Sequence, residues 1–153
     1  MGYIIIGIVV FLLDIMTKLV AELHLMPVDT IPLWEGVFHL TYVENRGIAF
    51  GMFSGQRLTF ILVTILVLAL LSYVYSKTKE KTNWMKWGVA LIYGGAVGNL
   101  MERLAKGYVV DFLDFRLIHF PVFNVADIAV CVGAVCLMIH FFLEPESGEK
   151  SNA

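Results

Sequence analysis

Two aspartates in the second half of the chain have a setting suited to acid–base chemistry. Asp127 stands at the head of residues 128–143, a run that holds only apolar residues and glycine apart from His140. A carboxylate at the start of such a membrane-length run is costly, so we treat Asp127 as a functional group. A second acid, Asp111, lies just upstream. Two carboxylates delivered to one membrane face suggest acid–base chemistry on a peptide or a lipid.

The spacing of the acids leaves the partner of Asp127 open. Asp114 lies three residues after Asp111 and competes with it for the second acidic role. Asn124, one turn before Asp127, is interpreted as a hydrogen-bond partner that orients the Asp127 carboxylate. From the residues alone, either Asp111 or Asp114 completes the pair.

Metal-dependent and covalent hydrolysis find no support in the sequence. The four histidines show no H-x-x-x-H spacing and no clustered acids, which argues against a zinc protease. No serine or cysteine stands beside a base in a recognisable elbow. Cys131 and Cys136 fall in the last apolar run on different faces of a helix, so we expect neither a disulfide nor a metal site there. We therefore expect no metal and no cofactor.

The composition is that of a membrane protein. The 153 residues are 59% hydrophobic and 16% charged, which is far more apolar than an average soluble domain. A membrane-spanning helix needs about 20 mostly apolar residues, and four stretches qualify, at about residues 2–21, 58–76, 84–101 and 122–143. The first has no basic leading region and no small-residue cleavage site, so we interpret it as a permanent span. We expect an all-α membrane protein with four transmembrane helices, forming a single domain over residues 1–153, with no nucleic-acid patch.

Lysines predict the orientation of these spans. Residues 77–86 connect the second and third stretches and contain four lysines, so the positive-inside rule places this loop in the cytoplasm. Four spans then put both termini in the cytoplasm and two segments outside, at about residues 22–57 and 105–121.

The first outer segment carries the pattern of a small hairpin on the membrane surface. Residues 37–43 are rich in aromatic and branched side chains and predict a strand. Residues 44–47 supply turn chemistry, and residues 48–53 are suited to a returning second strand. Trp34 marks the depth of the membrane interface.

The third stretch carries small residues and polar residues in different roles. Gly94 and Gly98 form a small-xxx-small pair that lets another helix approach closely, and helix packing is a sufficient explanation for them. Asn99 and Arg103 are four residues apart, so they project from one face at the outer end of this helix. That end is on the membrane side that receives both candidate acids.

The first stretch contains an acid and a base at helical spacing. Asp14 and Lys18 are four apart, in the favourable order of acid before base, near the outer end of the span. We interpret them as a structural ion pair or a helix-end anchor in preference to a direct chemical role.

Taken in order, these motifs resemble the bacterial lipoprotein signal peptidases, also called signal peptidase II, a family of aspartic membrane proteases. The matching segments are Asp14–Lys18, Glu44–Phe50, Gly94–Arg103, Val109–Phe112 and Phe120–Asp127. The resemblance extends from about residue 10 to residue 143. It implies four membrane helices with a small extracytoplasmic β-cradle, and cleavage of prolipoproteins just before a diacylglyceryl-modified cysteine.

The resemblance also implies roles for particular residues. The family's catalytic aspartates, in its V-V-D-F and N-x-A-D motifs, fall here on Asp111 and Asp127. The family's polar residues that line the substrate site fall here on Asn45, Asn99, Arg103 and Asn124. Its supporting residues near the site fall on Asp14 and Lys18. The implied partners are lipid-modified prolipoproteins and membrane lipid, with no nucleic acid, and the implied location is the bacterial plasma membrane with the site on the outer side. We expect a monomer.

Two positions depart from the family's pattern. Glu102 stands where the family usually has Asp, and one extra methylene moves a carboxylate by more than about an ångström, so its role is left as that of a supporting residue. Ile48 stands where the hairpin motif often has Ala. Neither position belongs to the acid pair.

The expected mechanism follows from placing two carboxylates close together. They cannot both ionise easily in a partly dry site, so they share a proton and titrate as a pair. One removes a proton from water while the other donates to the scissile carbonyl oxygen. The rival functions are a proton-coupled transporter or channel subunit, and a non-catalytic membrane scaffold. The first needs acids that step across the bilayer, and the second leaves both aspartates unexplained.

Overall fold

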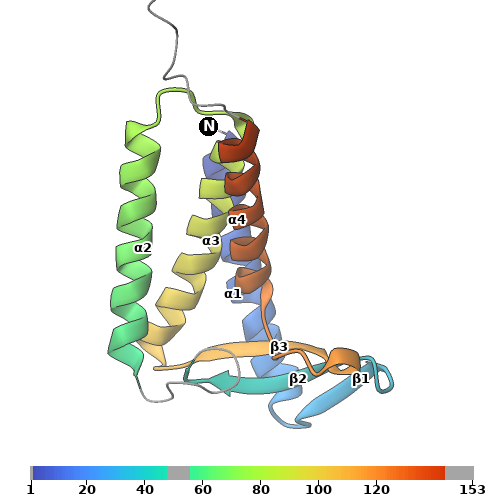
Figure 1. The fold of residues 1–153 in the computed structure, drawn as a ribbon. Helices are drawn as coiled ribbons and strands as arrows, with labels where there is room; N and C mark the ends of the chain where they lie inside the picture. Colours follow the sequence, from blue (N-terminus) through green and yellow to red (C-terminus); the bar gives the residue numbers. More distant parts are fainter. Residues whose placement is uncertain (1, 48–55, 144–153) are drawn as a thin grey trace, which may run out of the picture.

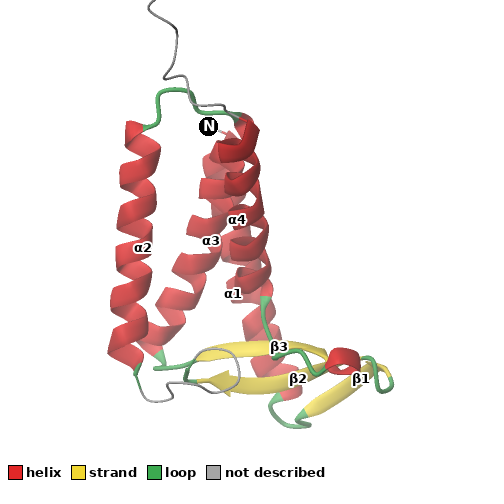
Figure 2. Ribbon diagram, in the orientation of Figure 1, coloured by secondary structure: helices red, strands yellow, loops and turns green. Residues whose placement is uncertain are grey.

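Four helices stand on a small β-sheet in the computed structural model, which describes residues 2–47 and 56–143 (Figures 1 and 2). The helices are α1 (Gly2–Leu25), α2 (Arg57–Lys77), α3 (Asn83–Ala105) and α4 (Val125–Leu143). The strands are β1 (Thr30–Trp34), β2 (Phe38–Asn45) and β3 (Val109–Phe115), and a short 3-10 turn η2 (Arg116–Ile118) follows β3. The sheet lies across one end of the helices, at the bottom of Figure 1.

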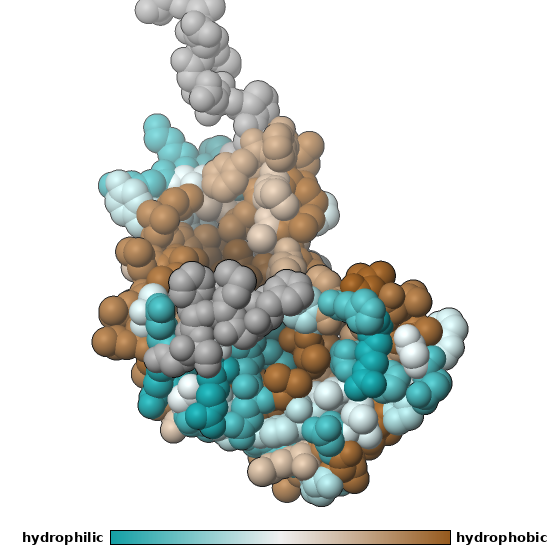
Figure 3. All heavy atoms as spheres, turned by 60° about the horizontal axis from the view of Figure 1, so that its bottom comes forward, coloured by the Kyte–Doolittle hydropathy of each residue, from teal (hydrophilic) through white to brown (hydrophobic). Residues whose placement is uncertain are grey.

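Three of the helices have the length and apolar character of membrane spans. They are α1, α2 and α4, and many of their large apolar side chains are exposed. In Figure 3 the helical part of the surface is mostly hydrophobic, whereas the sheet end mixes hydrophilic and hydrophobic residues. The central helix α3 is not among these three. It packs against each of the other helices, and its glycines allow that close approach.

Glycines on α3 set how closely its neighbours approach. A Cβ added to Gly94 would collide with the backbone of Gly7 in α1, and one added to Gly95 would collide with the carbonyl of Ala126 in α4. At Gly98, the added atom would meet the carboxylate of Asp14. The predicted packing role is confirmed for Gly94, while Gly98 leaves room for a charged side chain.

The sheet is larger than the predicted hairpin. The strand expected at residues 37–43 is confirmed as β2, but Glu44 and Asn45 of the expected turn continue the strand. The expected return strand at 48–53 lies outside the described residues. The sheet order is β1-β2-β3, with both pairs antiparallel. The hairpin prediction missed β3, because its pairing joins segments more than sixty residues apart, such as Val43 and Asp111.

A small apolar core fastens the sheet to the helices. Val110 and Phe112 of β3 pack with Ala21 and Leu25 at the end of α1, and all four are buried. Burial of a large apolar side chain stabilises by about 1.5–3 kcal/mol. The contact therefore holds the strand that carries Asp111 against the helices.

Replacing Gly95 with Ala is expected to lower the stability of the bundle by about 1–3 kcal/mol, because the added methyl meets backbone that cannot rotate away. Gly2→Ala is the matched control, since a Cβ there has no neighbour within 4 Å. Thermal melts in detergent compare the two variants. Equal melting temperatures would contradict the close packing of α3 on α4.

Candidate active site

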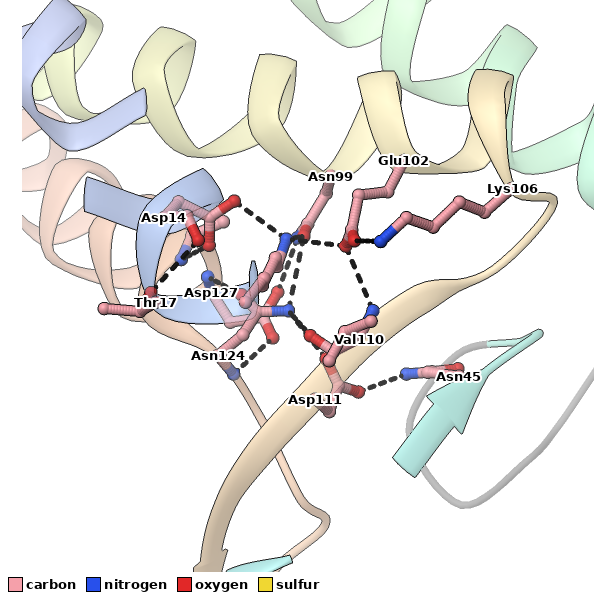
Figure 4. A network of polar contacts seen from close by, with 12 residues as sticks. Asp14, Thr17, Asn45, Asn99, Glu102, Lys106, Val110, Asp111, Asn124 and Asp127 are labelled. Carbon is pink, nitrogen blue, oxygen red and sulfur yellow. Dashed lines mark hydrogen bonds and ion pairs between the residues drawn. The ribbon is translucent and has the colours of Figure 1, made fainter. Parts of the chain in front are cut away.

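Asp111 and Asp127 belong to one polar cluster between the sheet and the helix ends (Figure 4). Asp111 comes from β3 and Asp127 from the first turn of α4. Asn124 connects them. Its side-chain Nδ2 donates to Asp111 Oδ1 over 2.6 Å, and its backbone N donates to Asp127 Oδ2 over 3.2 Å. The two acids are thus tied to the same residue.

The sequence Asn124 to Asp127 is a reciprocal cap at the start of α4. The Asn124 side-chain oxygen accepts from the backbone N of Asp127 at 2.9 Å, while the Asp127 carboxylate accepts from the backbone N of Asn124. This is the pattern of a capping box, which satisfies two otherwise free amides and fixes the side chains that make it. The predicted orienting role of Asn124 is confirmed, and Asp127 also serves as its partner.

Asn99 holds the second oxygen of Asp127. Its Nδ2 donates to Asp127 Oδ1 over 2.8 Å, and its Oδ1 accepts from Lys18 Nζ over 2.6 Å. An ammonium group can only donate, so Lys18 sets which end of the amide faces the acid. Asn124 Nδ2 also donates to Asn99 Oδ1, over 3.2 Å, so the lysine and the cap residue favour the same amide orientation.

Asn45 plays the corresponding part for Asp111. It ends β2, beside β3, and its Nδ2 donates to Asp111 Oδ2 over 2.8 Å. A shift in the register between Leu40 and Val43 precedes this point. Each oxygen of Asp111 therefore has an amide donor, and all four amide contacts to the pair come from residues predicted to line the site.

Asp14 and Lys18 form the predicted ion pair, with 2.8 Å between Asp14 Oδ2 and Lys18 Nζ, and both are buried. The other oxygen of Asp14 accepts from the backbone N of Ala126 at 2.9 Å. Asp14 therefore holds the first turn of α4, in addition to pairing with Lys18. That second contact was not predicted, because it joins residues far apart in the sequence.

The surroundings favour a proton on the acid pair at neutral pH. Burial and then the nearby charge of Asp127 raise the pKa of Asp111, the hydrogen bonds from Asn45 and Asn124 lower it, and the net result is a pKa of about 7. Two neighbouring carboxylates that hold one proton between them are the arrangement that acid–base hydrolysis requires.

Asp114, the rival for the second acid, faces a different set of partners. Its carboxylate accepts from Thr41 at 2.7 Å and from Arg116 Nε at 2.8 Å. Burial by itself raises the pKa of Asp114, but the hydrogen bonds from Thr41 and Arg116 outweigh it and leave the pKa below its usual value. Asp114 is therefore a paired carboxylate of the sheet, separate from the cavity that contains Asp111.

Asp111 and Asp127 both line a cavity of about 500 Å³. Asn45 and Arg103 complete its polar end, and it continues along α4 past Ile128, Cys131 and Val132. Most of the wall is apolar, with residues 120–123 on one side. The cavity can accept a chain that is polar where it meets the acids and apolar beyond them.

Arg103 places a positively charged guanidinium at this cavity. Its guanidinium lies over the ring of Phe60, 5.4 Å from the ring centre, and its Nη2 is 3.5 Å from the carbonyl oxygen of Gly47. A planar guanidinium with several N–H donors suits carbonyl or ester oxygens.

Glu102 was left as a supporting residue in the sequence analysis, but its contact with β3 was not predicted. Glu102 joins the network from α3, and the backbone N of Val110 donates to it over 3.0 Å. The capping box could have been found, because Asn-x-x-Asp before an apolar run is a helix-start signal. Within residues 2–47 and 56–143, no three His, Cys, Asp or Glu side chains gather as metal ligands, and Cys131 and Cys136 are both free thiols.

The chain is similar to proteins of one family along nearly its whole length. Residues 6–143 match the family model described as signal peptidase (SPase) II. A lipoprotein signal peptidase of Halothermothrix orenii is 43% identical over 149 residues, covering 97% of this chain and 100% of the relative. One from Caldanaerobacter subterraneus subsp. tengcongensis is 48% identical over 138 residues, covering 90% and 92%.

Solved structures share the fold. A bacterial membrane enzyme determined by the in meso method at 2.3 Å resolution has a TM-score of 0.86 and 27% sequence identity, covering 99% of this chain and 94% of that one. A second, at 1.9 Å, has a TM-score of 0.82 and 29% identity, covering 94% of each chain.

Replacing Asn124 with Ala is expected to lower stability by about 1–3 kcal/mol, because both the cap and a donor to the buried Asp111 carboxylate are lost. Asn124→Ser keeps a capping oxygen, but its shorter side chain cannot donate to Asp111, so it should recover only the capping part. Thermal melts at about pH 8, where Asp111 is ionised, give the comparison. If both variants matched the wild type, Asn124 would not connect α4 and β3.

Proposed function

The chain belongs to the signal peptidase II family, and on that basis we propose that it removes signal peptides from lipid-modified prolipoproteins with Asp111 and Asp127 as its catalytic pair. The cut falls immediately before the diacylglyceryl-modified cysteine of the precursor. Asn124 supports the residue assignment, because it donates hydrogen bonds to both carboxylates at one end of the cavity that Asp111 and Asp127 line.

The catalytic step uses one proton shared by the two carboxylates. The ionised partner takes a proton from a water molecule as the water oxygen attacks the scissile carbonyl carbon. The protonated partner donates to the carbonyl oxygen. When the tetrahedral intermediate collapses, the C–N bond breaks, the partner that took the water's proton gives it to the leaving amine, and the other partner takes a hydroxyl proton back as the carbonyl re-forms. The raised pKa of Asp111 supports this step, because the pair then retains a proton near neutral pH.

The cavity supports a division of the substrate between its two ends. The scissile peptide lies at Asp111 and Asp127, where Arg103 and Asn45 offer donors to backbone carbonyls or to the glyceryl esters. The apolar part of the precursor lies along the α4 wall formed by Ile128 and Val132. Membrane lipid surrounds the exposed apolar faces of the helices.

We place the pair on the outer side of the bacterial plasma membrane. The sheet and both acids lie at one end of the bundle, and the loop between α2 and α3, with Lys79 and Lys81, lies at the other (Figure 1). Lysine-rich loops stay in the cytoplasm. With α3 as the fourth span, both termini are cytoplasmic, and residues 1–153 act as a single protease domain in a monomer.

A proton-conducting function is less well supported. Acids in a proton pathway are spaced across the membrane. Here Asp14, Glu102, Asp111 and Asp127 gather around the sheet end (Figure 4).

Asp111→Asn and Asp127→Asn should each lower kcat by about 10³-fold or more while the protein still inserts and folds, since each removes one half of a shared-proton pair. Asp114→Asn is the control on the same strand and should keep substantial activity, because its carboxylate binds Thr41 and Arg116 instead of the cavity. The measurement is cleavage of a diacylglyceryl-modified precursor by purified variants, with a thermal melt to check folding. An active Asp111→Asn alongside an inactive Asp114→Asn would overturn the assignment.

The pair should also impose an upper pH limit on turnover. The pKa of Asp111 is raised to about 7, so its carboxyl is protonated below that pH and ionised above it. As the pH rises through this range the pair loses its shared proton, and kcat/KM should fall. The pH profile of kcat/KM reports the titration of the free enzyme. A profile that stays flat from about pH 6 to about pH 9 would contradict the shared-proton mechanism.

A further inference from the structure

Glu102 contacts three separate parts of the chain. It lies near the end of α3 and is 7% exposed. Its Oε2 accepts from the backbone N of Val110 at 3.0 Å and lies 3.1 Å from Lys18 Nζ, while its Oε1 lies 3.0 Å from Lys106 Nζ. Figure 4 shows this carboxylate between α3 and the strand that carries Asp111.

The contact with Val110 fixes the backbone next to a proposed catalytic acid. Val110 is fully buried and immediately precedes Asp111. A hydrogen bond to an ionised acceptor is roughly twice as strong as one between neutral groups. The bond therefore holds the start of β3 at a set distance from α3, and Asp111 moves with it.

The contact with Lys18 reaches the other acid. Lys18 Nζ donates to Asn99 Oδ1 over 2.6 Å, and Asn99 Nδ2 donates to Asp127 Oδ1 over 2.8 Å. Lys18 is shared between Asp14 and Glu102, at 2.8 Å and 3.1 Å. Glu102 thus offsets the buried positive charge of Lys18, which is linked to Asp127 through the side-chain amide of Asn99.

We propose that Glu102 is a positioning residue for both catalytic acids, holding Asp111 through the Val110 amide and orienting Asn99 on Asp127 through Lys18. A carboxylate one methylene shorter would draw back towards α3 and lose one of its three partners. The longer side chain of glutamate serves this chain by reaching the strand and both lysines at once. This inference rests on the proposed roles of Asp111 and Asp127.

The charge of Glu102 also has a predictable effect on the pair. The positive charge of Lys18 lowers the pKa of Asp111. Neutralising Glu102 removes a negative charge and leaves Lys18 less offset, and both changes favour the ionised forms of the acids. The pair then loses its shared proton at a lower pH, so the upper limb of the kcat/KM profile moves towards acid.

Three variants of the purified protein separate these effects, assayed on a diacylglyceryl-modified precursor. Glu102→Gln keeps the shape of the side chain and removes its charge. It should lower kcat by about tenfold or more with little change in KM. It should also shift the upper limb of the kcat/KM profile by about half a pH unit towards acid. Glu102→Asp keeps the charge and loses reach, so kcat should fall while the limb stays in place. Glu22→Gln is the matched control, because Glu22 pairs with Lys106 at 2.5 Å but not with Lys18 or Val110, and it should stay within about twofold of wild type.

Two results would overturn the proposal. The first is that Glu102→Gln or Glu102→Asp folds and has the kcat of the wild type. The second is that Glu102→Gln loses activity without a shift in the upper limb of its kcat/KM profile, and that Glu22→Gln loses as much activity. If Glu102→Gln fails to fold, as judged by thermal melt, the kcat of Glu102→Asp decides. Asp111→Asn is assayed alongside. If Asp111→Asn is active, the proposed function is wrong. If Asp111→Asn is inactive and the Glu102 variants have the kcat of the wild type, only the positioning role of Glu102 is wrong.

Discussion

The hydrogen bond from the Asn124 side chain to Asp111 joins the two halves of the site. It connects the start of α4 to the middle of β3, which are neighbours in space but belong to different layers of the molecule. The same residue closes the capping box with Asp127. A buried carboxylate that loses a donor is costly, and without Asn124 each acid would keep only its donor from Asn45 or Asn99. The local pattern that begins α4 therefore also holds a proposed catalytic carboxylate in place.

Around this bond, some polar residues contact the acids directly and others hold those residues in place. Asn45 and Asn99 each contact one acid directly, and Lys18 fixes the orientation of the Asn99 amide. Behind them, Asp14 and Glu102 balance the charge of Lys18 and hold backbone amides of α4 and β3. Each buried charged residue of this network has a partner of opposite sign or a hydrogen-bond donor, as buried charges require.

The sequence predicts the helices better than the sheet, for physical reasons. Apolar runs of membrane length place α1, α2 and α4 to within a few residues. The polar and small residues of α3 become clear only when its neighbours are known, because it lies between the other three helices. Strand β3 depends on a long-range pairing with β2, and no local pattern distinguishes that pairing from a loop.

The site shows the same division between local and distant information. The acids and asparagines stand out as polar residues beside apolar runs, and the family resemblance assigns them. The contacts of Asp14 with Ala126 and of Glu102 with Val110 join different elements, so spacing along the chain could not reveal them. Spacing alone left Asp111 and Asp114 as alternatives, and the family resemblance assigned Asp111. In the structure Asp111 lines the cavity, whereas Asp114 accepts a hydrogen bond from Thr41.

The central claim is that Asp111 and Asp127 act as one unit. A double-mutant cycle on kcat/KM tests it most directly, using Asp111→Asn, Asp127→Asn and the double variant on the same lipid-modified precursor. If the two acids share one proton, the double variant is no slower than either single variant, because removing one acid already abolishes the shared-proton step. Losses that instead multiply, so that the double variant is slower by the product of the two single effects, would contradict it.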